Sequence, residues 1–232
     1  MNPTPGMNPM NFAVVVIPAF NESALIADVV AQVRRVCPCV VLVDDGSSDG
    51  TADIARSAGA IVLRHAINLG QGAALQTGIT YALQLGAKAI VTFDADGQHD
   101  PDDIPSLLAV LESGAGAALG SRFAGKALGM PATRRLVLQA ARWVNYALTG
   151  VKLSDAHNGI RALSRDVALR LQLHEPGMAH ATEIIAQLAE QKARIVEVPV
   201  TIRYSAYSLA KGQRLSNALR ILIDLMMRSF VR

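Results

Sequence analysis

Acidic, amide and basic side chains follow the short apolar runs of this sequence at the points where strands would end. The segments are Pro18-Ala19-Phe20-Asn21-Glu22, Asp44-Asp45-Gly46-Ser47-Ser48-Asp49-Gly50, Asp94-Ala95-Asp96-Gly97-Gln98-His99-Asp100, and Ser121-Arg122. In open parallel sheets, ligands bind outside the carboxyl ends of the strands. A helix cap would explain Asp49 alone, but it would not explain all four segments. The sequence therefore predicts one binding site at this edge of a sheet.

Asp94 and Asp96 are spaced as two carboxylate ligands on either side of a turn. Hard oxygen ligands of this kind suit Mg²⁺ or Mn²⁺ that also holds a substrate diphosphate, and Gln98 adds a neutral oxygen. We therefore predict a metal site at Asp94, Asp96 and Gln98, where the ion would act as a Lewis acid on a leaving nucleotide diphosphate. The alternative is a turn that only caps the helix starting at Pro101, a role that Asp100 fits in either case.

The elements that must position these residues alternate between strand and helix patterns. Short β-branched runs predict strands at residues 13–17, 40–44, 60–63, 89–94, 117–120 and 194–198. Periodic segments predict helices at residues 23–36, 49–58, 71–85, 100–112, 133–149, 182–191 and 215–231. This alternation indicates an α/β fold, a doubly wound and mostly parallel sheet flanked by helices.

Length and composition fit one globular domain. The 232 residues are 51% hydrophobic and 18% charged, which excludes disordered and low-complexity classes. A net charge of +3 and 4% aromatic residues argue against a nucleic-acid partner. Two cysteines, Cys37 and Cys39, form neither a disulfide framework nor a zinc pattern. Without a membrane-length apolar run or a signal-like start, the expected location is the cytoplasm, with residues 1–11 as a flexible tail.

Five segments in order give the sequence a family resemblance. They are Ile17-Pro18-Ala19-Phe20-Asn21-Glu22, Val43-Asp44-Asp45-Gly46-Ser47-Ser48-Asp49-Gly50-Thr51, Asn68-Leu69-Gly70-Gln71-Gly72-Ala73-Ala74, Asp94-Ala95-Asp96-Gly97-Gln98-His99 and Gly120-Ser121-Arg122-Phe123. With them the sequence resembles the inverting family 2 glycosyltransferases of the GT-A fold, and most closely their dolichyl-phosphate mannose synthase branch. The resemblance runs from about Phe12 to Lys211.

The resemblance implies a metal-dependent hexosyltransferase that moves a sugar from a GDP-mannose or UDP-glucose type donor to polyprenyl phosphate. Asp96 and Arg122 would be catalytic, and Mg²⁺ or Mn²⁺ would be the cofactor. Gln71 departs from the Lys or Arg that relatives commonly carry, which puts a charged contact from that loop in doubt. The implied nucleotide-binding residues are Pro18, Ala19, Asn21, Glu22, Asp45, Gly46, Gly72, Asp94 and Ala95.

The second half of the chain is similar to the acceptor side of the same branch, in the segments 155–162 and 197–200. A lipid phosphate is already ionised near neutral pH, so it needs positioning and charge neutralisation rather than a strong base. We predict that Arg122, Arg203 and Lys211 contact phosphates; the alternative is ordinary solvated surface charge.

Two other functions stay open from the sequence. Transfer to a hydroxyl of a cell-envelope glycan would require a general base, for which Asp155 and Glu183 are the candidates. A nucleotide-sugar-binding module without turnover is the other alternative.

Two short motifs are interpreted as chance matches. The segment Gly70-Gln71-Gly72 lacks the third glycine of a dinucleotide fingerprint. Gln139-Ala140-Ala141-Arg142-Trp143 spells a signature of processive polysaccharide synthases, but it falls within a plain helix. We expect Trp143 in the core and Arg142 on the helix surface.

The C-terminal segment is basic and strongly apolar. From Arg203 onward there are six Lys or Arg residues and a single acid, Asp224. An amphipathic helix of this kind could bind a membrane surface, a partner or the domain core, and a membrane-spanning partner subunit is possible. The expected organisation is a tail (1–11), one GT-A domain (12–205, with a nucleotide-binding half 12–125 and an acceptor half 126–205) and a C-terminal segment (206–232). The expected site of action is the inner face of the cytoplasmic membrane.

Overall fold

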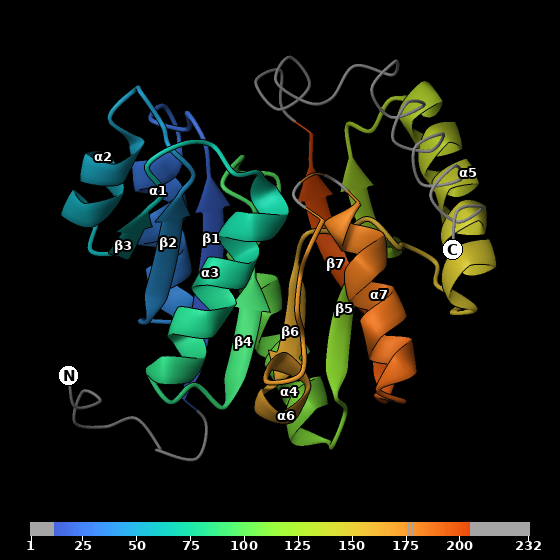
Figure 1. Ribbon diagram of the computed structural model, residues 1–232. Helices are drawn as coiled ribbons and strands as arrows, with labels where there is room; N and C mark the ends of the chain where they lie inside the picture. The colour runs from blue at the N-terminus through green and yellow to red at the C-terminus, as the bar shows by residue number, and fades with distance from the viewer. Residues whose placement is uncertain (1–11, 176, 178, 205–232) are drawn as a thin grey trace.

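The computed structural model describes residues 12–175, 177 and 179–204 (Figure 1). Its strands are β1 (Ala13–Ala19), β2 (Val40–Asp44), β3 (Ile61–Arg64), β4 (Ala89–Thr92), β5 (Ala117–Leu128), β6 (Arg161–Ser164) and β7 (Ile195–Arg203). Its helices are α1 (Ile26–Val36), α2 (Thr51–Ser57), α3 (Gln71–Gln84), the 3₁₀ turn η2 (Pro101–Asp103), α4 (Ile104–Glu112), α5 (Ala132–Thr149), α6 (Arg165–Ala168) and α7 (His180–Glu190). The predicted C-terminal helix and Lys211 lie outside the described residues.

The strands form one seven-stranded sheet in the order β3-β2-β1-β4-β6-β5-β7. β1 pairs in parallel with β2 and β4, and β5 pairs in parallel with β7. The predicted α/β class with a mostly parallel sheet is therefore confirmed. The exception is β6, which runs antiparallel to both β4 and β5. The sequence did not predict β6, because this strand has only four residues and they show no alternation of apolar and polar side chains.

Successive residues of the central strands face opposite layers of helices, as the two-residue period of a strand requires. Val15 and Ile17 pack with α1, α2 and α4 on one face. Val14 and Val16 pack with α3, α6 and α7 on the other. Because the strands are covered on both faces, their runs are apolar throughout, and every residue of β1 and β2 is buried.

The second half of the sheet departs from the expected boundaries. β5 and β7 extend well beyond residues 120 and 198, and their pairing is interrupted between Ser121 and Lys126. Arg122 therefore lies at an irregularity within β5 rather than at its end. Where the chain is described, none of the helices combines the length and hydropathy needed to cross a membrane.

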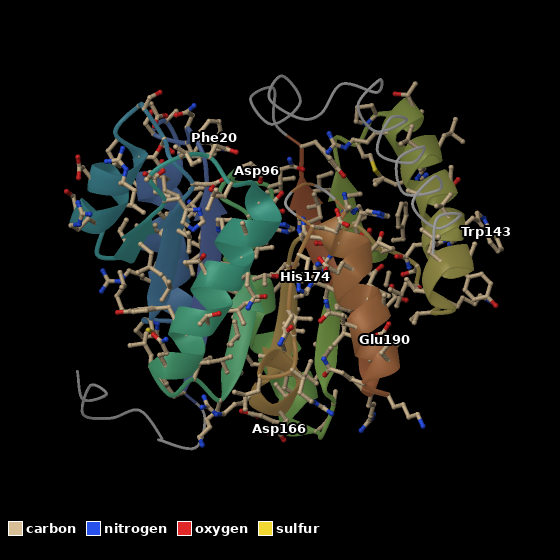
Figure 2. The ribbon with its side chains drawn as sticks, in the orientation of Figure 1. Phe20, Asp96, Trp143, Asp166, His174 and Glu190 are labelled. Carbon is tan, nitrogen blue, oxygen red and sulfur yellow. The ribbon has the colours of Figure 1, made fainter. Side chains whose placement is uncertain are left out.

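Helix α5 corrects one prediction about the core. Asn145 is the one buried residue of its eighteen, and Trp143 is 60% exposed. Figure 2 shows Trp143 on the outer side of the helix, away from the sheet. The expectation that Trp143 belongs to the core is thus wrong, because an apolar residue in an amphipathic pattern does not by itself show which face meets the protein.

Candidate active site

A pocket of about 500 Å³ opens at the carboxyl ends of β1, β2 and β4, where the sequence predicted a site. Figure 2 shows Phe20 and Asp96 together at this end of the sheet. The lining residues from the first half of the chain include Pro18, Ala19, Phe20, Glu22, Asp45, Asn68, Gln71, Asp94, Ala95, Asp96, Gln98 and His99. Those from the second half include Arg122, Arg134, His157, Arg161, His180 and Ile202.

Asp45 organises the wall of the pocket that follows β2. Its two carboxylate oxygens accept hydrogen bonds from the backbone N–H groups of Leu69 (2.9 Å) and Gly70 (2.8 Å). Nδ1 of His65 lies 2.7 Å from the same carboxylate, and Nε2 of His65 lies 3.0 Å from the hydroxyl of Thr77 in α3. Asp45 thus fixes the turn that leads into α3 and is itself held by His65.

Three of the residues predicted to bind nucleotide support the pocket from outside its lining. The side-chain oxygen of Asn21 accepts from the backbone N–H of Ser48 at 3.0 Å, which joins the segments after β1 and β2. Gly46 has a φ of 78°, and a side chain there would meet the backbone of Ile67. Gly72 has no room for a side chain, because a Cβ would lie 1.9 Å from the carbonyl oxygen of Glu175. Their direct contact with a nucleotide stays a prediction.

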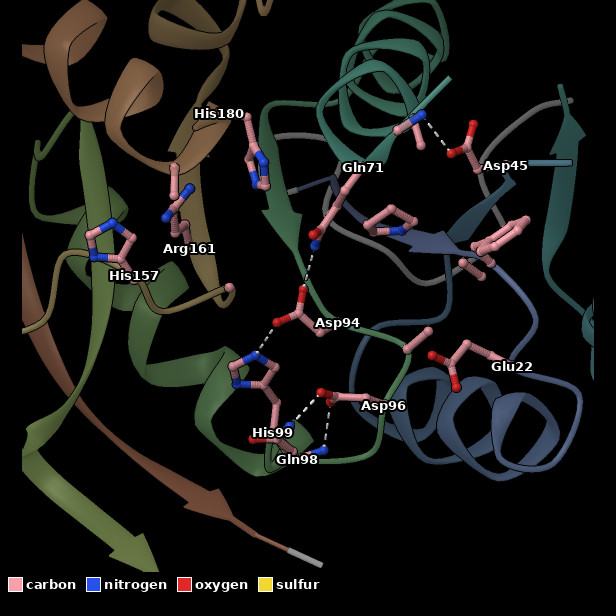
Figure 3. A pocket seen from close by; sticks show the side chains of 18 of the residues that line it. Glu22, Asp45, Gln71, Asp94, Asp96, Gln98, His99, His157, Arg161 and His180 are labelled. Carbon is pink, nitrogen blue, oxygen red and sulfur yellow. Dashed lines mark hydrogen bonds and ion pairs between the residues drawn. The ribbon is translucent and has the colours of Figure 1, made fainter. Parts of the chain in front are cut away.

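The acidic turn after β4 brings Asp94 and Asp96 to the floor of the pocket (Figure 3). Nε2 of His99 lies 2.9 Å from Oδ2 of Asp94, and the amide of Gln71 donates to Oδ1 at 3.2 Å. Burial opposes the charge of Asp94, but the hydrogen bond and charge of His99 hold its pKa below the ordinary value. Asp96 is the opposite case, because burial and the neighbouring Asp94 charge raise its pKa.

The donor set at this turn fits a divalent cation. Two carboxylates share the turn, and burial together with the neighbouring Asp94 charge raises the pKa of Asp96, so a cation between them would offset their repulsion. No set of three His, Cys, Asp or Glu side chains among the described residues converges on a common point. Asp94 and Asp96 would hold the ion, and substrate phosphates and water would complete its shell, as is usual for Mg²⁺.

Gln98 is turned toward Asp96 in this structure. Its amide nitrogen lies 2.6 Å from Oδ2 of Asp96, and its backbone N–H donates to Oδ1 at 3.0 Å. This arrangement makes Gln98 a residue that orients Asp96. Its own ligation of a metal stays a prediction.

The Asp94 carboxylate can occupy its position only because residue 159 is a glycine and has no side chain. A Cβ at Gly159 would lie 2.0 Å from Oδ2 of Asp94. The carbonyl of Gly159 accepts from the Thr92 hydroxyl at 2.7 Å, which fixes this loop against β4. The acidic floor and the loop before β6 therefore meet in direct contact.

The opposite wall is cationic and begins with a buried ion pair. Nε of Arg122 lies 2.6 Å from Oδ2 of Asp155, and both side chains are almost fully buried. Burial opposes the charge of Arg122, but Asp155 raises the pKa of its guanidinium above the ordinary value. Nη1 of Arg122 donates to the hydroxyl of Tyr204 at 2.7 Å. The ring of Tyr204 in turn lies 5.1 Å below the guanidinium of Arg134 from α5.

Arg161 continues this wall between two histidines (Figure 3). It is 3% exposed, and burial lowers its pKa to about 10, so it stays charged at neutral pH. Burial and the charge of Arg161 lower the pKa of His157 to about 4 and also lower that of His180. At neutral pH both imidazoles are therefore uncharged.

The two candidate bases do not line the pocket. Asp155 is occupied by Arg122 and by the amide of Asn158 at 3.2 Å. Glu183 accepts from the backbone N–H groups of His174 and Glu175, both at 3.0 Å. The carboxylates that do line the pocket all come from residues 22–96.

Arg203 and Glu197 also lie apart from the pocket lining. Nη2 of Arg203 pairs with Asp100 at 2.9 Å, and the side chain of Arg203 is 60% exposed. The structure thus does not bring Arg203 to the site. Glu197 accepts from the backbone N–H groups of Ser154 and Asp155, so it positions the loop that carries the partner of Arg122.

The sequence and fold can now be compared with known proteins. The model of the family named Glycosyl transferase family 2 matches residues 14–170. The chain belongs to glycosyl transferase family 2. An uncharacterized protein of Methanocaldococcus jannaschii is 36% identical, with 92% of this chain and 90% of the relative covered.

Two relatives of this family 2 protein carry functional names. A UDP-N-acetylglucosamine–dolichyl-phosphate N-acetylglucosaminyltransferase of Methanococcus voltae is 30% identical, covering 92% of this chain and 94% of the relative. A polyprenol monophosphomannose synthase of Mycolicibacterium smegmatis is 29% identical, covering 88% and 82%. They confirm the predicted dolichyl-phosphate mannose synthase-like branch and make this chain a glycosyltransferase.

The fold matches solved glycosyltransferases. Glucosyl-3-phosphoglycerate synthase of Mycobacterium tuberculosis, in complex with Mn²⁺, UDP and phosphoglyceric acid, superposes with a TM-score of 0.71 at 21% identity. The match covers 94% of this chain and 78% of that chain. The predicted GT-A fold is therefore confirmed.

Several residues that line the pocket of this family 2 transferase, or contact its lining, were not among the functional candidates of the sequence analysis. They are His65, Arg134, Arg161, His180 and Tyr204. Arg134 and Tyr204 come from distant segments and meet through tertiary packing, which no local motif reports. His157 and Arg161 stand in the segment 155–162 that resembles the acceptor side, and that resemblance was the signal that could have marked them as candidates.

We predict that His65→Leu lowers the free energy of unfolding by about 1.5–3 kcal/mol, because the Asp45 carboxylate loses a buried hydrogen-bond donor. Thr77→Val is the matched variant and should cost about 1 kcal/mol, since it removes a neutral partner of the same ring. Urea unfolding measures both. Equal stability of His65→Leu and the parent chain would contradict the assigned role of His65.

Removal of the charge at Asp155 should destabilise the fold far more than removal of an exposed acid. Asp155→Asn leaves Arg122 charged and buried, which costs about 3–5 kcal/mol. Asp53→Asn is the control, because Asp53 pairs with Arg56 at the surface, where its side chain is 81% exposed, and such pairs contribute less than about 1 kcal/mol. Denaturant titration of both variants is the measurement, and similar losses in the two would refute the assignment.

Proposed function

We propose that this glycosyltransferase moves a sugar from a nucleotide diphosphate sugar to a polyprenyl phosphate, with inversion at the sugar carbon and with a divalent metal. The observation that supports this proposal is the separation of charge across the pocket. Glu22, Asp45, Asp94 and Asp96 line one side, and Arg122, Arg134 and Arg161 line the other.

The acidic side suits the donor. A nucleotide diphosphate is itself anionic, so a wall of carboxylates accepts it when a cation lies between them. Mg²⁺ or Mn²⁺ held by Asp94 and Asp96 would supply that charge and would polarise the departing diphosphate. Glu22 and Asp45, at the ends of β1 and β2, are the proposed contacts of the nucleoside.

The cationic side suits an anionic acceptor. Arg122 and Arg134 both reach the pocket and are joined through Tyr204, so their spacing is fixed before a ligand binds. A phosphate monoester is ionised near neutral pH and is already a nucleophile, which removes the need for a general base. This fits the location of Asp155 and Glu183, which are engaged elsewhere and do not line the pocket.

The reaction then consists mainly of positioning. The acceptor phosphate oxygen attacks the anomeric carbon on the face opposite the diphosphate, and the new C–O bond forms as the old one breaks. Arg122 and Arg134 hold the attacking phosphate and lower the repulsion between two anionic substrates. An α-linked donor gives a β-linked product.

The named relatives support the lipid acceptor and leave several donors to test. One relative is named for dolichyl phosphate and UDP-N-acetylglucosamine, and another for polyprenol monophosphomannose. We propose a GDP-mannose or UDP-glucose type donor for this chain. Because a polyprenyl phosphate resides in a membrane, the proposal also includes peripheral binding at the inner face of the cytoplasmic membrane. A membrane-spanning partner subunit stays a prediction.

Asp96→Asn should reduce turnover by at least about two orders of magnitude, because it removes an anionic ligand where the leaving diphosphate must be neutralised. Asp102→Asn is the matched control, since Asp102 is an exposed acid six residues further along. The assay follows radiolabelled GDP-mannose, UDP-glucose and UDP-N-acetylglucosamine, each with and without polyprenyl phosphate. Full activity of the parent protein in EDTA would overturn the metal proposal.

Arg134→Ala should raise the KM for polyprenyl phosphate by about tenfold or more, because it removes a charge-assisted contact to the acceptor. The KM for the nucleotide sugar should change little. Arg135→Ala is the control, because Arg135 is exposed and carries the same charge on the same helix turn as Arg134. Equal effects of the two variants would contradict a specific role of Arg134.

A further inference from the structure

Helix α5 presents an apolar stripe to solvent. Leu136 is 66% exposed, Trp143 is 60% exposed and Tyr146 is 43% exposed. Their spacing of seven and three residues places them along one side of the helix. Leu128 at the end of β5, which is 45% exposed, precedes the helix by four residues. Large side chains exposed together in this way mark an interaction surface.

The opposite side of α5 already meets the protein. Val137, Leu138, Val144 and Leu148 are half-buried, and Asn145 is buried. The helix therefore uses one apolar side to pack on its own domain and keeps a second apolar side outward, where no described residue covers it. Figure 1 shows α5 at the edge of the molecule, beyond β5 and β7.

The charge of α5 is of one sign. The helix contains Arg134, Arg135 and Arg142 and no acidic residue. The guanidinium of Arg142 lies 5.5 Å from the centre of the Trp143 ring, and Trp143 and Tyr146 are in edge-to-face contact at 6.5 Å. A basic helix with Trp and Tyr on its apolar side combines the two attractions that hold interfacial helices on anionic bilayers.

We propose that the outward stripe of α5, formed by Leu136, Trp143 and Tyr146, seats the protein on an anionic lipid surface. Its connection to catalysis rests on the proposed lipid acceptor. Arg134 in the first turn of α5 lines the pocket, so the helix lies beside the cationic wall. This assignment places membrane contact within the folded domain, in addition to the C-terminal segment for which the sequence predicted it.

Trp143 is the sole tryptophan of the chain, so its fluorescence reports on the proposed surface alone. The full chain is titrated with vesicles of phosphatidylglycerol and, separately, of phosphatidylcholine, both without polyprenyl phosphate. We expect a blue shift of Trp143 emission and quenching by brominated acyl chains with the anionic vesicles. High salt and neutral vesicles should both weaken the response.

Leu136→Glu should weaken vesicle binding by about tenfold or more, because it removes an apolar side chain that would insert into the bilayer and places a negative charge there. Leu169→Glu is the matched control, since Leu169 is 55% exposed and lies after α6, remote from the stripe. Vesicle flotation measures both variants, and circular dichroism checks that they fold. With a short-chain, water-soluble polyprenyl phosphate, Leu136→Glu should keep the parent kcat.

The other occupants of this surface give different results, and each would overturn the proposal. If residues 205–232 cover the stripe, their deletion red-shifts Trp143 without vesicles. If a second copy covers it, the emission depends on protein concentration. If vesicles bind with no change at Trp143, the contact lies elsewhere. Because the vesicles hold no acceptor, a failed transfer assay with intact vesicle binding would overturn only the proposed function.

Discussion

A guanidinium removed from water needs a counter-charge, and the second half of this structure is arranged around one such pair. Arg122 lies in β5 where the pairing with β7 is interrupted, and Asp155 meets it from the loop before β6. Glu197 in β7 fixes that loop through its backbone N–H groups, and Tyr204 completes the partners of the guanidinium. These residues come from three parts of the chain, namely β5, the loop before β6, and β7 with the residue that follows it, so the ion pair links the segments of the cationic wall.

The two carboxylates of the acidic floor, Asp94 and Asp96, are also removed from water, but their charges are compensated to different extents. Asp94 receives hydrogen bonds from His99 and Gln71, and its pKa is lowered, whereas Asp96 receives them from Gln98 and its pKa is raised. His99 thus favours the charged form of Asp94, whereas burial and the Asp94 charge disfavour the charged form of Asp96. Such an imbalance suits a site that takes a cation together with its anionic substrate. Gly159, which has no side chain, lets the loop of the cationic wall approach Asp94 closely.

The sequence predicted the first half of the molecule well, because there the candidate site residues stand shortly after the apolar runs that predict the strands. Strand β2 and the start of α3 fall where the apolar runs place them, and Asp94 lies two residues beyond the end of β4 at Thr92. The second half depends on contacts between distant segments. β6 is four residues long and pairs through tertiary context, and Tyr204 reaches Arg122 across 82 positions. Trp143 was misplaced because the period of a helix gives its faces and not the neighbour of each face.

For charged side chains too, the sequence does not show which tertiary neighbour each one meets, and Arg203 is an example. A basic residue near the end of a strand fits a phosphate contact and a surface ion pair equally well, and its pairing with Asp100 is set by how β7 passes the acidic turn. The cations that do line the pocket are those with buried or aromatic partners. A polyprenyl chain is far larger than a pocket of about 500 Å³, so with the proposed acceptor the phosphate would enter while most of the hydrocarbon stays outside. If the outward stripe of α5 contacts lipid as proposed, this helix beside the cationic wall would keep the bilayer within reach of the phosphate.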